Sequence, residues 1–142
     1  MNNKDRRLYN REHLWCLRRA NNTAIIGISE QAQRYLGEIT WIWLPDAGSE
    51  IARGEVFASI ESSGPVDALV SPLDGRIINI NNHLRFRPDT VNRDPYGEGW
   101  LLHVQLEHAG QLDGMMDARQ YMAYIDEIDG DSVDTEPKAA SN

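Results

Sequence analysis

The stretch ESSGPVDALVSP, residues 61–72, decides the fold that the sequence predicts. Residues 56–60 before it are mostly apolar and predict a strand, and residues 68–70 predict the returning strand. Gly64 and Pro65 stand between these two strands. Glycine tolerates a positive φ and proline fixes its own φ, so the pair suits a tight turn. The stretch therefore predicts a β-hairpin with its tip at Gly64-Pro65.

Further short strands are expected on both sides of this hairpin, separated by turn residues. They cover residues 13–18, 23–28, 39–44, 76–80 and 100–106. A short helix is expected over residues 30–36, with Ser29 as its N-cap and Gly37 at its end, and a second helix over residues 114–125. Residues 81–94 are polar and predict a long loop. This pattern predicts a mainly β fold, a flattened barrel or sandwich with a short internal helix and a C-terminal helix.

The strand at residues 39–44 (ITWIWL) has apolar residues on both of its faces. It is therefore expected to be covered on both sides. Trp41 and Trp43 on this strand, together with Trp100, could instead form a surface on which a ligand stacks. Packing in the core is the favoured interpretation for all three, because a strand of a compact β fold usually buries its aromatic rings.

The bulk properties limit the class of protein. A chain of 142 residues with 41% hydrophobic and 25% charged residues is long enough for one domain with a sizeable core. The net charge of −8 argues against a nucleic-acid partner. The single Cys16 cannot form an internal disulfide, and no apolar run suits a secretory signal or a membrane span. We expect a soluble, cytoplasmic monomer.

Three segments are expected along the chain. Residues 1–12 are polar and predict a flexible N-terminal segment, and residues 13–126 hold the strands and helices of the domain. Residues 127–142 are acidic and then small and polar, which predicts a disordered tail.

The sequence offers no evident catalytic or metal site. Ser62 and Ser63 have no base beside them in the sequence, and hydroxyls in a turn usually bond to their own backbone. His103 and His108 are not joined by a cysteine or aspartate that would complete a zinc pattern. Glu61 is interpreted as a solvated carboxylate. We therefore expect neither catalytic residues nor a metal ion, and no enzyme activity.

Several segments together resemble the H protein of the glycine cleavage system, the lipoyl-bearing shuttle that carries an aminomethyl group between enzymes. They are residues 23–29 (TAIIGIS), 32–33 (AQ), 36–39 (LGEI), 44–45 (LP), 61–62 (ES), 69–72 (LVSP), 92–101 (NRDPYGEGWL), 117–118 (DA) and Tyr121. The resemblance covers residues 13–126. It implies a fold of the lipoyl/biotinyl-domain type in its H-protein form.

The departures from the family pattern lie at the positions that carry or hold the lipoyl arm. The family hairpin has the order Glu-Ser-Val-Lys-Ala, which places Gly64 where the lipoyl-bearing lysine stands. Leu14 stands where the family has a glutamate, and Gln31 stands where it has a histidine. In the family those two residues help to hold the amine of the loaded arm. Only Lys4 and Lys138 remain in the whole chain as amines for a lipoyl amide, so no cofactor is expected at the hairpin.

Two functions remain open on the sequence. The first is a divergent H-like protein that carries no lipoyl group and acts as an interaction or regulatory partner of the proteins of glycine cleavage or lipoate metabolism. The alternative is a genuine lipoyl carrier, which shuttles an aminomethyl group in glycine decarboxylation or serves another lipoyl-dependent pathway. Lipoyl is expected as a cofactor only in the second case.

Overall fold

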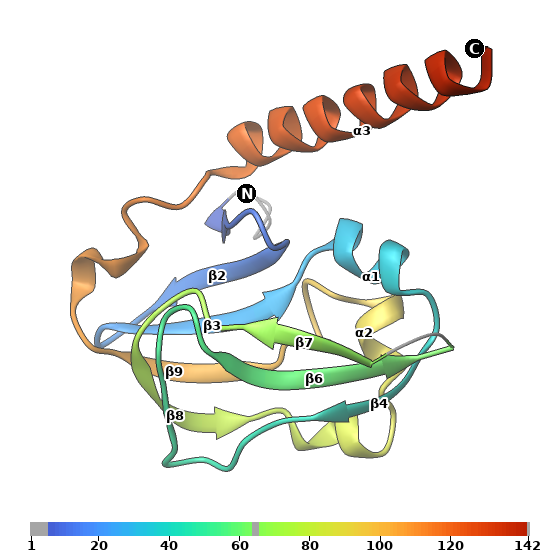
Figure 1. Cartoon of the computed structure of the whole chain (residues 1–142). Coiled ribbons are helices and arrows are strands. Elements are labelled where there is room, and N and C mark those ends of the chain that lie inside the picture. Colours follow the sequence, from blue (N-terminus) through green and yellow to red (C-terminus); the bar gives the residue numbers. More distant parts are fainter. Residues whose placement is uncertain (1–5, 64–65, 142) are drawn as a thin grey trace.

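The computed structural model of the protein describes residues 6–63 and 66–141. Two antiparallel sheets pack against each other (Figure 1). The larger sheet has the spatial order β1 (Leu8–Tyr9), β2 (Leu14–Arg19), β3 (Thr23–Ile28), β9 (Leu102–Leu106), β8 (Gly75–Ile80), β5 (Glu50–Ile51). The smaller sheet has the order β4 (Ile39–Trp43), β6 (Val56–Ser62), β7 (Val66–Val70). The helical elements are α1 (Glu30–Leu36), η2 (Asn82–Arg85), α2 (Thr90–Arg93), η3 (Ala109–Leu112) and α3 (Ala118–Ser141).

The expected mainly β fold with an internal and a C-terminal helix is confirmed. The two sheets form an open sandwich rather than a closed barrel. Side chains from both sheets fill the space between them, among them Ile26, Ile60, Ile77 and Val104, each at most 1% exposed. Burial of this apolar surface is the main force that holds the layers together.

A second apolar cluster fastens α3 to the N-terminal strands. The rings of Tyr9 and Tyr121 stack with centroids 4.3 Å apart, and Trp15 and Ile125 complete the buried cluster. Figure 1 shows α3 lying above β2, with its later turns extending away from the sheets. The first turns of α3 are therefore the part that docks on the domain.

The structure differs from the sequence prediction at both ends of the chain. Within the segment expected to be flexible, residues 1–12, Leu8 and Tyr9 form β1 on the edge of the larger sheet, because Tyr9 inserts into the second cluster. Within the tail expected to be disordered, residues 127–142, α3 continues to Ser141. Ile128 extends the apolar stripe of Tyr121 and Ile125 by one more turn, which the sequence boundary at residue 126 overlooks.

The long loop predicted over residues 81–94 contains two short helical turns, η2 and α2. Leu84 in η2 and Val91 in α2 are at most 1% exposed, and each is the one apolar side chain that its turn places in the core. One apolar residue per turn gives no periodic pattern, so the sequence did not reveal these helices.

The strand at residues 39–44 is covered on one side only, which contradicts the sequence prediction. A β-bulge between Ile39 and Trp41 turns Ile39 into the core with Ile42. Trp41 and Trp43 alternate with the buried Ile42 and lie on the outer face, each 51% exposed. The interpretation of these two residues as core is therefore wrong, whereas Trp100 packs against the second cluster as a partly buried residue.

Across the described stretches 6–63 and 66–141, no helix has the length and apolar character needed to cross a bilayer.

Candidate functional site

Strands β6 and β7 form the predicted hairpin, with Glu61 opposite Val66. Glu61 and Ser63 are exposed and Ser62 is half-buried. The hydroxyl of Thr40 donates a hydrogen bond to the Glu61 carbonyl at 3.2 Å, which ties β6 to β4. Gly64 and Pro65, the predicted tip of the hairpin, lie outside the described residues.

The side chains of this hairpin do not fit a lipoyl group. Attachment requires a lysine amine, and the described ends of the two strands offer the hydroxyls of Ser62 and Ser63 and the carboxylates of Glu61 and Asp67. Gly64, which the sequence resemblance predicts at the lysine position, has no side chain.

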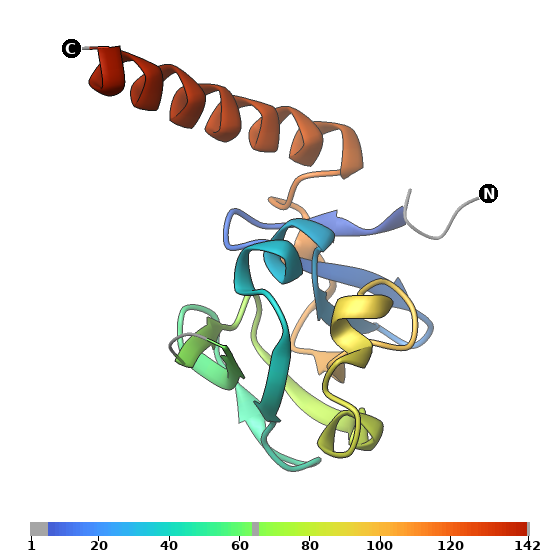
Figure 2. The same cartoon turned by 90° about the vertical axis from the view of Figure 1, so that its right-hand side faces the viewer.

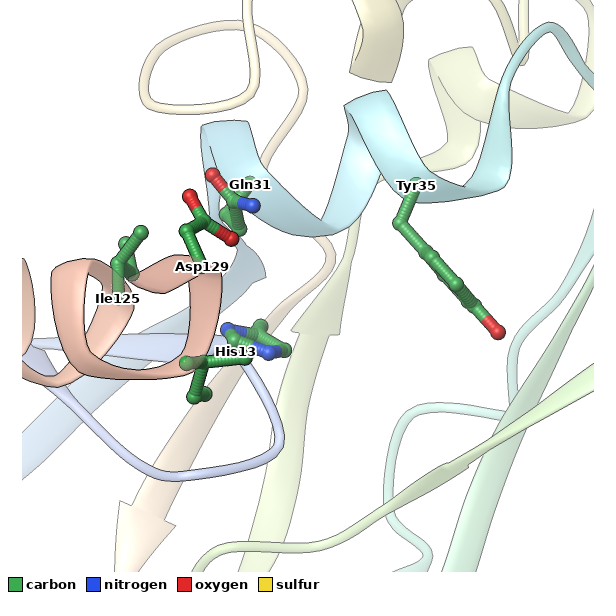
Figure 3. A pocket seen from close by; sticks show the side chains of 6 residues that line it. His13, Gln31, Tyr35, Ile125 and Asp129 are labelled. Atoms are coloured by element: carbon green, nitrogen blue, oxygen red, sulfur yellow. The ribbon is translucent and has the colours of Figure 1, made fainter. Parts of the chain in front are cut away.

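A cavity of about 390 Å³ lies between α1 and α3 (Figure 3). Its walls are His13, Gln31, Tyr35, Ile125, Ile128 and Asp129. In Figure 3, Gln31 and Asp129 face one another across the gap, and the ring of Tyr35 points away from them. A Cβ placed on Gly37, the C-cap of α1, would lie 3.9 Å from Ser63 Oγ, so the end of α1 is close to the hairpin.

Leu14 and Gln31, the two predicted departures from the family pattern, have different surroundings. Gln31 lines the cavity, beside His13. Leu14 is 1% exposed and packs into the main core. The structure thus brings Gln31, but not Leu14, to the cavity wall. An isobutyl side chain at position 14 is stabilised by the core, where a carboxylate would need a partner.

A chain of hydrogen bonds runs behind this cavity and was not predicted from the sequence. The Tyr121 hydroxyl lies 2.7 Å from His13 Nδ1 and 2.7 Å from Ser29 Oγ, and Ser29 Oγ accepts from the Ala32 N–H at 3.1 Å. Every proton in the chain finds an acceptor when Ser29 donates to Tyr121 and Tyr121 donates to His13 Nδ1. This arrangement fixes the ring of His13 and caps α1 at the same time.

Burial sets the protonation of these groups at neutral pH. It lowers the pKa of His13, partly offset by the nearby carboxylates of Glu12 and Asp129. It also raises the pKa of Tyr121 to about 12, against the opposing effect of the Ser29 hydrogen bond. His13 is therefore neutral and Tyr121 protonated at pH 7, as the hydrogen-bond chain requires.

The segment NRDPYGEGWL, residues 92–101, holds α1 and the cavity in place. The Asn92 side chain accepts from the Ile39 N–H at 2.9 Å and donates to the Gly37 carbonyl at 2.7 Å. The Tyr96 hydroxyl accepts from the Glu30 N–H at 3.0 Å, at the first turn of α1. Both ends of α1 are thus fixed by this one segment.

His103 and His108 do not lie in a common ligand site. His103 Nε2 lies 2.9 Å from the Thr23 hydroxyl in the larger sheet, and His108 precedes η3. Over the described residues, no three His, Cys, Asp or Glu side chains gather as metal ligands would.

Comparisons with known proteins point to the same family as the sequence segments. A family model described as glycine cleavage H-protein matches residues 7–128. The chain belongs to this family. The glycine cleavage system H protein of Anaeromyxobacter sp. (strain K) is 38% identical over 119 residues, which cover 84% of this chain and 92% of that protein. That of Mycolicibacterium smegmatis is 40% identical over 123 residues, with 84% and 93% covered.

A solved structure of the H-protein family has the same fold. The crystal structure of a glycine cleavage system H protein from Mycobacterium marinum superposes with a TM-score of 0.76 at 29% sequence identity, and the match covers 84% of this chain and 96% of that one. The family resemblance drawn from the sequence segments is therefore confirmed.

Proposed function

We propose that this chain acts as an H-protein-type component in glycine catabolism, which docks on the enzymes of the glycine cleavage system and has no catalytic site of its own. The family match over residues 7–128 and the relatives at 38–40% identity support this proposal. The sandwich, α1 and the segment 92–101 give a rigid scaffold beside the hairpin, and a docking protein needs such a scaffold.

The first candidate role is docking without cargo. The observation that supports it is the amine count: residues 5–137 contain no lysine, and Gly64 occupies the lipoyl position. A shuttle works because a tethered arm keeps its group at high effective concentration between two sites. Without the arm, the scaffold occupies the partner's binding site without delivering a group. In that role it regulates glycine cleavage or the enzymes that attach lipoate.

The second candidate role is a lipoyl carrier, and the comparisons favour it. The relatives from Anaeromyxobacter, Mycolicibacterium and Myxococcus all have the name glycine cleavage system H protein. In this chain the role requires an amide on Lys4 or Lys138, at the two ends of the sequence. The same attachment would also serve a carrier in another lipoyl-dependent pathway.

Intact mass spectrometry of the protein from lipoylating cells separates the two roles. The matched control is a double variant, Gly64→Lys with Pro65→Ala, which restores the family order of lysine and alanine at the hairpin. Docking without cargo predicts an unmodified mass for the natural chain and an added lipoyl mass for the control. An added lipoyl mass on the natural chain, lost when Lys4 or Lys138 is changed to Arg, establishes the carrier role.

Docking itself is tested with purified enzymes. Glycine decarboxylase and aminomethyltransferase from the same cell should each be titrated with the chain by calorimetry. Binding to at least one of them is expected. Absence of binding to both, with binding retained by a lipoylated H protein from a relative, contradicts the proposed function.

A further inference from the structure

The outer face of the three-stranded sheet exposes two tryptophans. Trp41 and Trp43 on β4 are each 51% exposed, while Ile42 between them is 4% exposed and belongs to the core. In Figure 1 this sheet lies in front of the larger one, and in Figure 2 it lies on the left-hand side with no helix over its outer face. Large exposed aromatic side chains in a patch mark interaction sites more often than free surface.

The pairing of the strands extends this apolar face across the sheet. Trp41 is opposite Glu61, and Glu61 is opposite Val66 on β7. Val66 is 61% exposed. Trp43 is likewise opposite Ser59. The patch therefore reaches from the edge strand β4 to the hairpin that in the family carries the lysine.

Charges at this face are mainly acidic and lack ion-pair partners. Within the described part of the chain, the five ion pairs involve neither Glu61 nor Asp46. Asp46 and Arg85 are the charged walls of a groove of about 340 Å³ that also contains both tryptophans. An indole ring beside an unpaired carboxylate suits a guanidinium group, which stacks on the ring and bonds to the carboxylate in one geometry.

We propose that the face made by Trp41, Trp43, Glu61 and Val66 docks a protein partner through an arginine side chain of that partner. The arginine stacks on an indole ring and pairs with Glu61, and neighbouring apolar side chains of the partner cover Val66. This inference rests on the proposed function, in that the partner is an enzyme of glycine cleavage.

Other occupants fit the charges less well. A nucleic acid or an anionic membrane surface would bring negative charge to Glu61 and Asp46 on a chain with a net charge of −8. A second copy of the chain would do the same, since it has the same net charge. A basic protein surface complements the face, and tryptophan and arginine are the residues most enriched at binding hot spots.

The first test measures binding to purified glycine decarboxylase and aminomethyltransferase. The double variant Trp41→Thr with Trp43→Thr keeps strand-forming residues and should weaken binding by about thirty-fold or more. Glu61→Gln should weaken it by about threefold and reduce its salt dependence. The matched control is Ile78→Thr, which removes an apolar side chain, 45% exposed, from β8 of the other sheet and should leave binding unchanged.

The second test uses a chemical probe and no enzyme. N-acetylarginine methylamide and N-acetyllysine methylamide are titrated against the labelled protein while the indole N–H resonances are followed by NMR. The arginine probe should shift the resonances of Trp41 and Trp43 and not that of the buried Trp15. It should shift them more than the lysine probe, and Glu61→Gln should reduce the difference.

The outcomes separate this inference from the proposed function. Binding of an enzyme that is equal in the natural chain and the tryptophan double variant overturns the inference and leaves the proposed function intact. Absence of binding to both enzymes contradicts the proposed function. In that case the NMR titration alone tests the preference of this face for arginine. Equal shifts with the arginine and the lysine probe overturn the inference. A dimer in light scattering that the double variant abolishes assigns the face to a second copy and also overturns the inference.

Discussion

The guanidinium carbon of Arg7 lies 4.4 Å from the centre of the Trp15 ring, and the Tyr96 ring lies 5.2 Å from the same carbon. Arg7 is only 4% exposed, and its side chain donates a hydrogen bond to the Tyr96 carbonyl. Its Nε has no hydrogen-bond partner among the described residues. The contribution of Arg7 therefore comes mainly from stacking and packing, which join β1 to the segment 92–101.

Two substitutions at Arg7 separate packing from charge. Arg7→Ala should lower the free energy of unfolding by about 2–3 kcal/mol, because it removes the stacked side chain. Arg7→Met keeps most of the volume without a buried charge and should cost about 1 kcal/mol or less. Urea denaturation measures both values. Equal losses in the two variants would show that the charge, and not the packing, stabilises this corner.

Removal of one hydroxyl should disconnect the hydrogen-bond chain behind the cavity. Tyr121→Phe keeps the ring stacked on Tyr9 but leaves the buried Ser29 hydroxyl and His13 Nδ1 without their shared partner. We expect a loss of about 1–3 kcal/mol in the free energy of unfolding. Tyr124→Phe is the control, because its hydroxyl donates to the Arg11 carbonyl at an exposed site, and should cost less than about 0.5 kcal/mol. A loss no larger than that of this control would contradict the role given to Tyr121.

The lowered pKa of His13 predicts how stability depends on pH. Burial lowers its pKa from the ordinary value of 6.5, so the unfolded chain takes up a proton before the folded one does. The contribution of neutral His13 to the free energy of unfolding is therefore complete above pH 6.5. It is lost as the pH falls from 6.5 through the pKa of His13 in the folded chain. Thermal unfolding across this window should show a smaller loss for His13→Asn than for the natural chain.

The loss of stability at low pH that remains in His13→Asn is assigned to His103, because burial and the charge of Arg19 lower the pKa of His103 too. The control His83→Gln changes an exposed histidine in η2 and should change the free energy of unfolding at pH 7 by less than about 0.5 kcal/mol. Identical pH profiles for the natural chain and His13→Asn would refute the assignment.

Gly27 shows how tightly the second cluster is packed. A Cβ at this position would lie 2.4 Å from Cζ2 of Trp15. That indole cannot easily move, because its N–H donates to the carbonyls of Ile28 at 2.9 Å and Pro95 at 3.1 Å. Gly27→Ala should therefore cost about 3 kcal/mol or more, as measured by urea denaturation.

Gly114→Ala is the matched control for Gly27, because nothing lies within 4 Å of a Cβ at that position. It should change the free energy of unfolding by less than about 0.5 kcal/mol. A cost at Gly27 as small as this would mean that Trp15 can move aside.

Local signals account for the elements that the sequence predicted well. The Ser29 side chain accepts from Ala32 N–H and Gly37 has a φ of +79°, so α1 begins and ends where its capping residues predict. Residues 23–28 form β3 with the predicted bounds, since their β-branched pattern is contained within the strand itself.

The features that escaped prediction depend on distant residues. Ser29 and Tyr121 are 92 positions apart in the hydrogen-bond chain, and no spacing rule links them. The exposure of Trp41 and Trp43 could not be predicted from the letters ITWIWL, because both faces of the strand carry apolar residues and only the packing of the two sheets decides which face is covered. The cavity likewise needs α3 placed beside α1, an arrangement that only the packing of Tyr9, Trp15 and Tyr121 determines.

Cys16, the sole thiol of the chain, has no exposed surface, and burial raises the pKa of its thiol to about 12. Maleimides react with thiolates, so the native protein should resist them until β2 separates from its neighbours. A cysteine introduced in place of the exposed Ser63 could then be alkylated selectively. The chain would in this way accept a synthetic tether next to the hairpin tip, on a scaffold whose own sequence supplies no amine there.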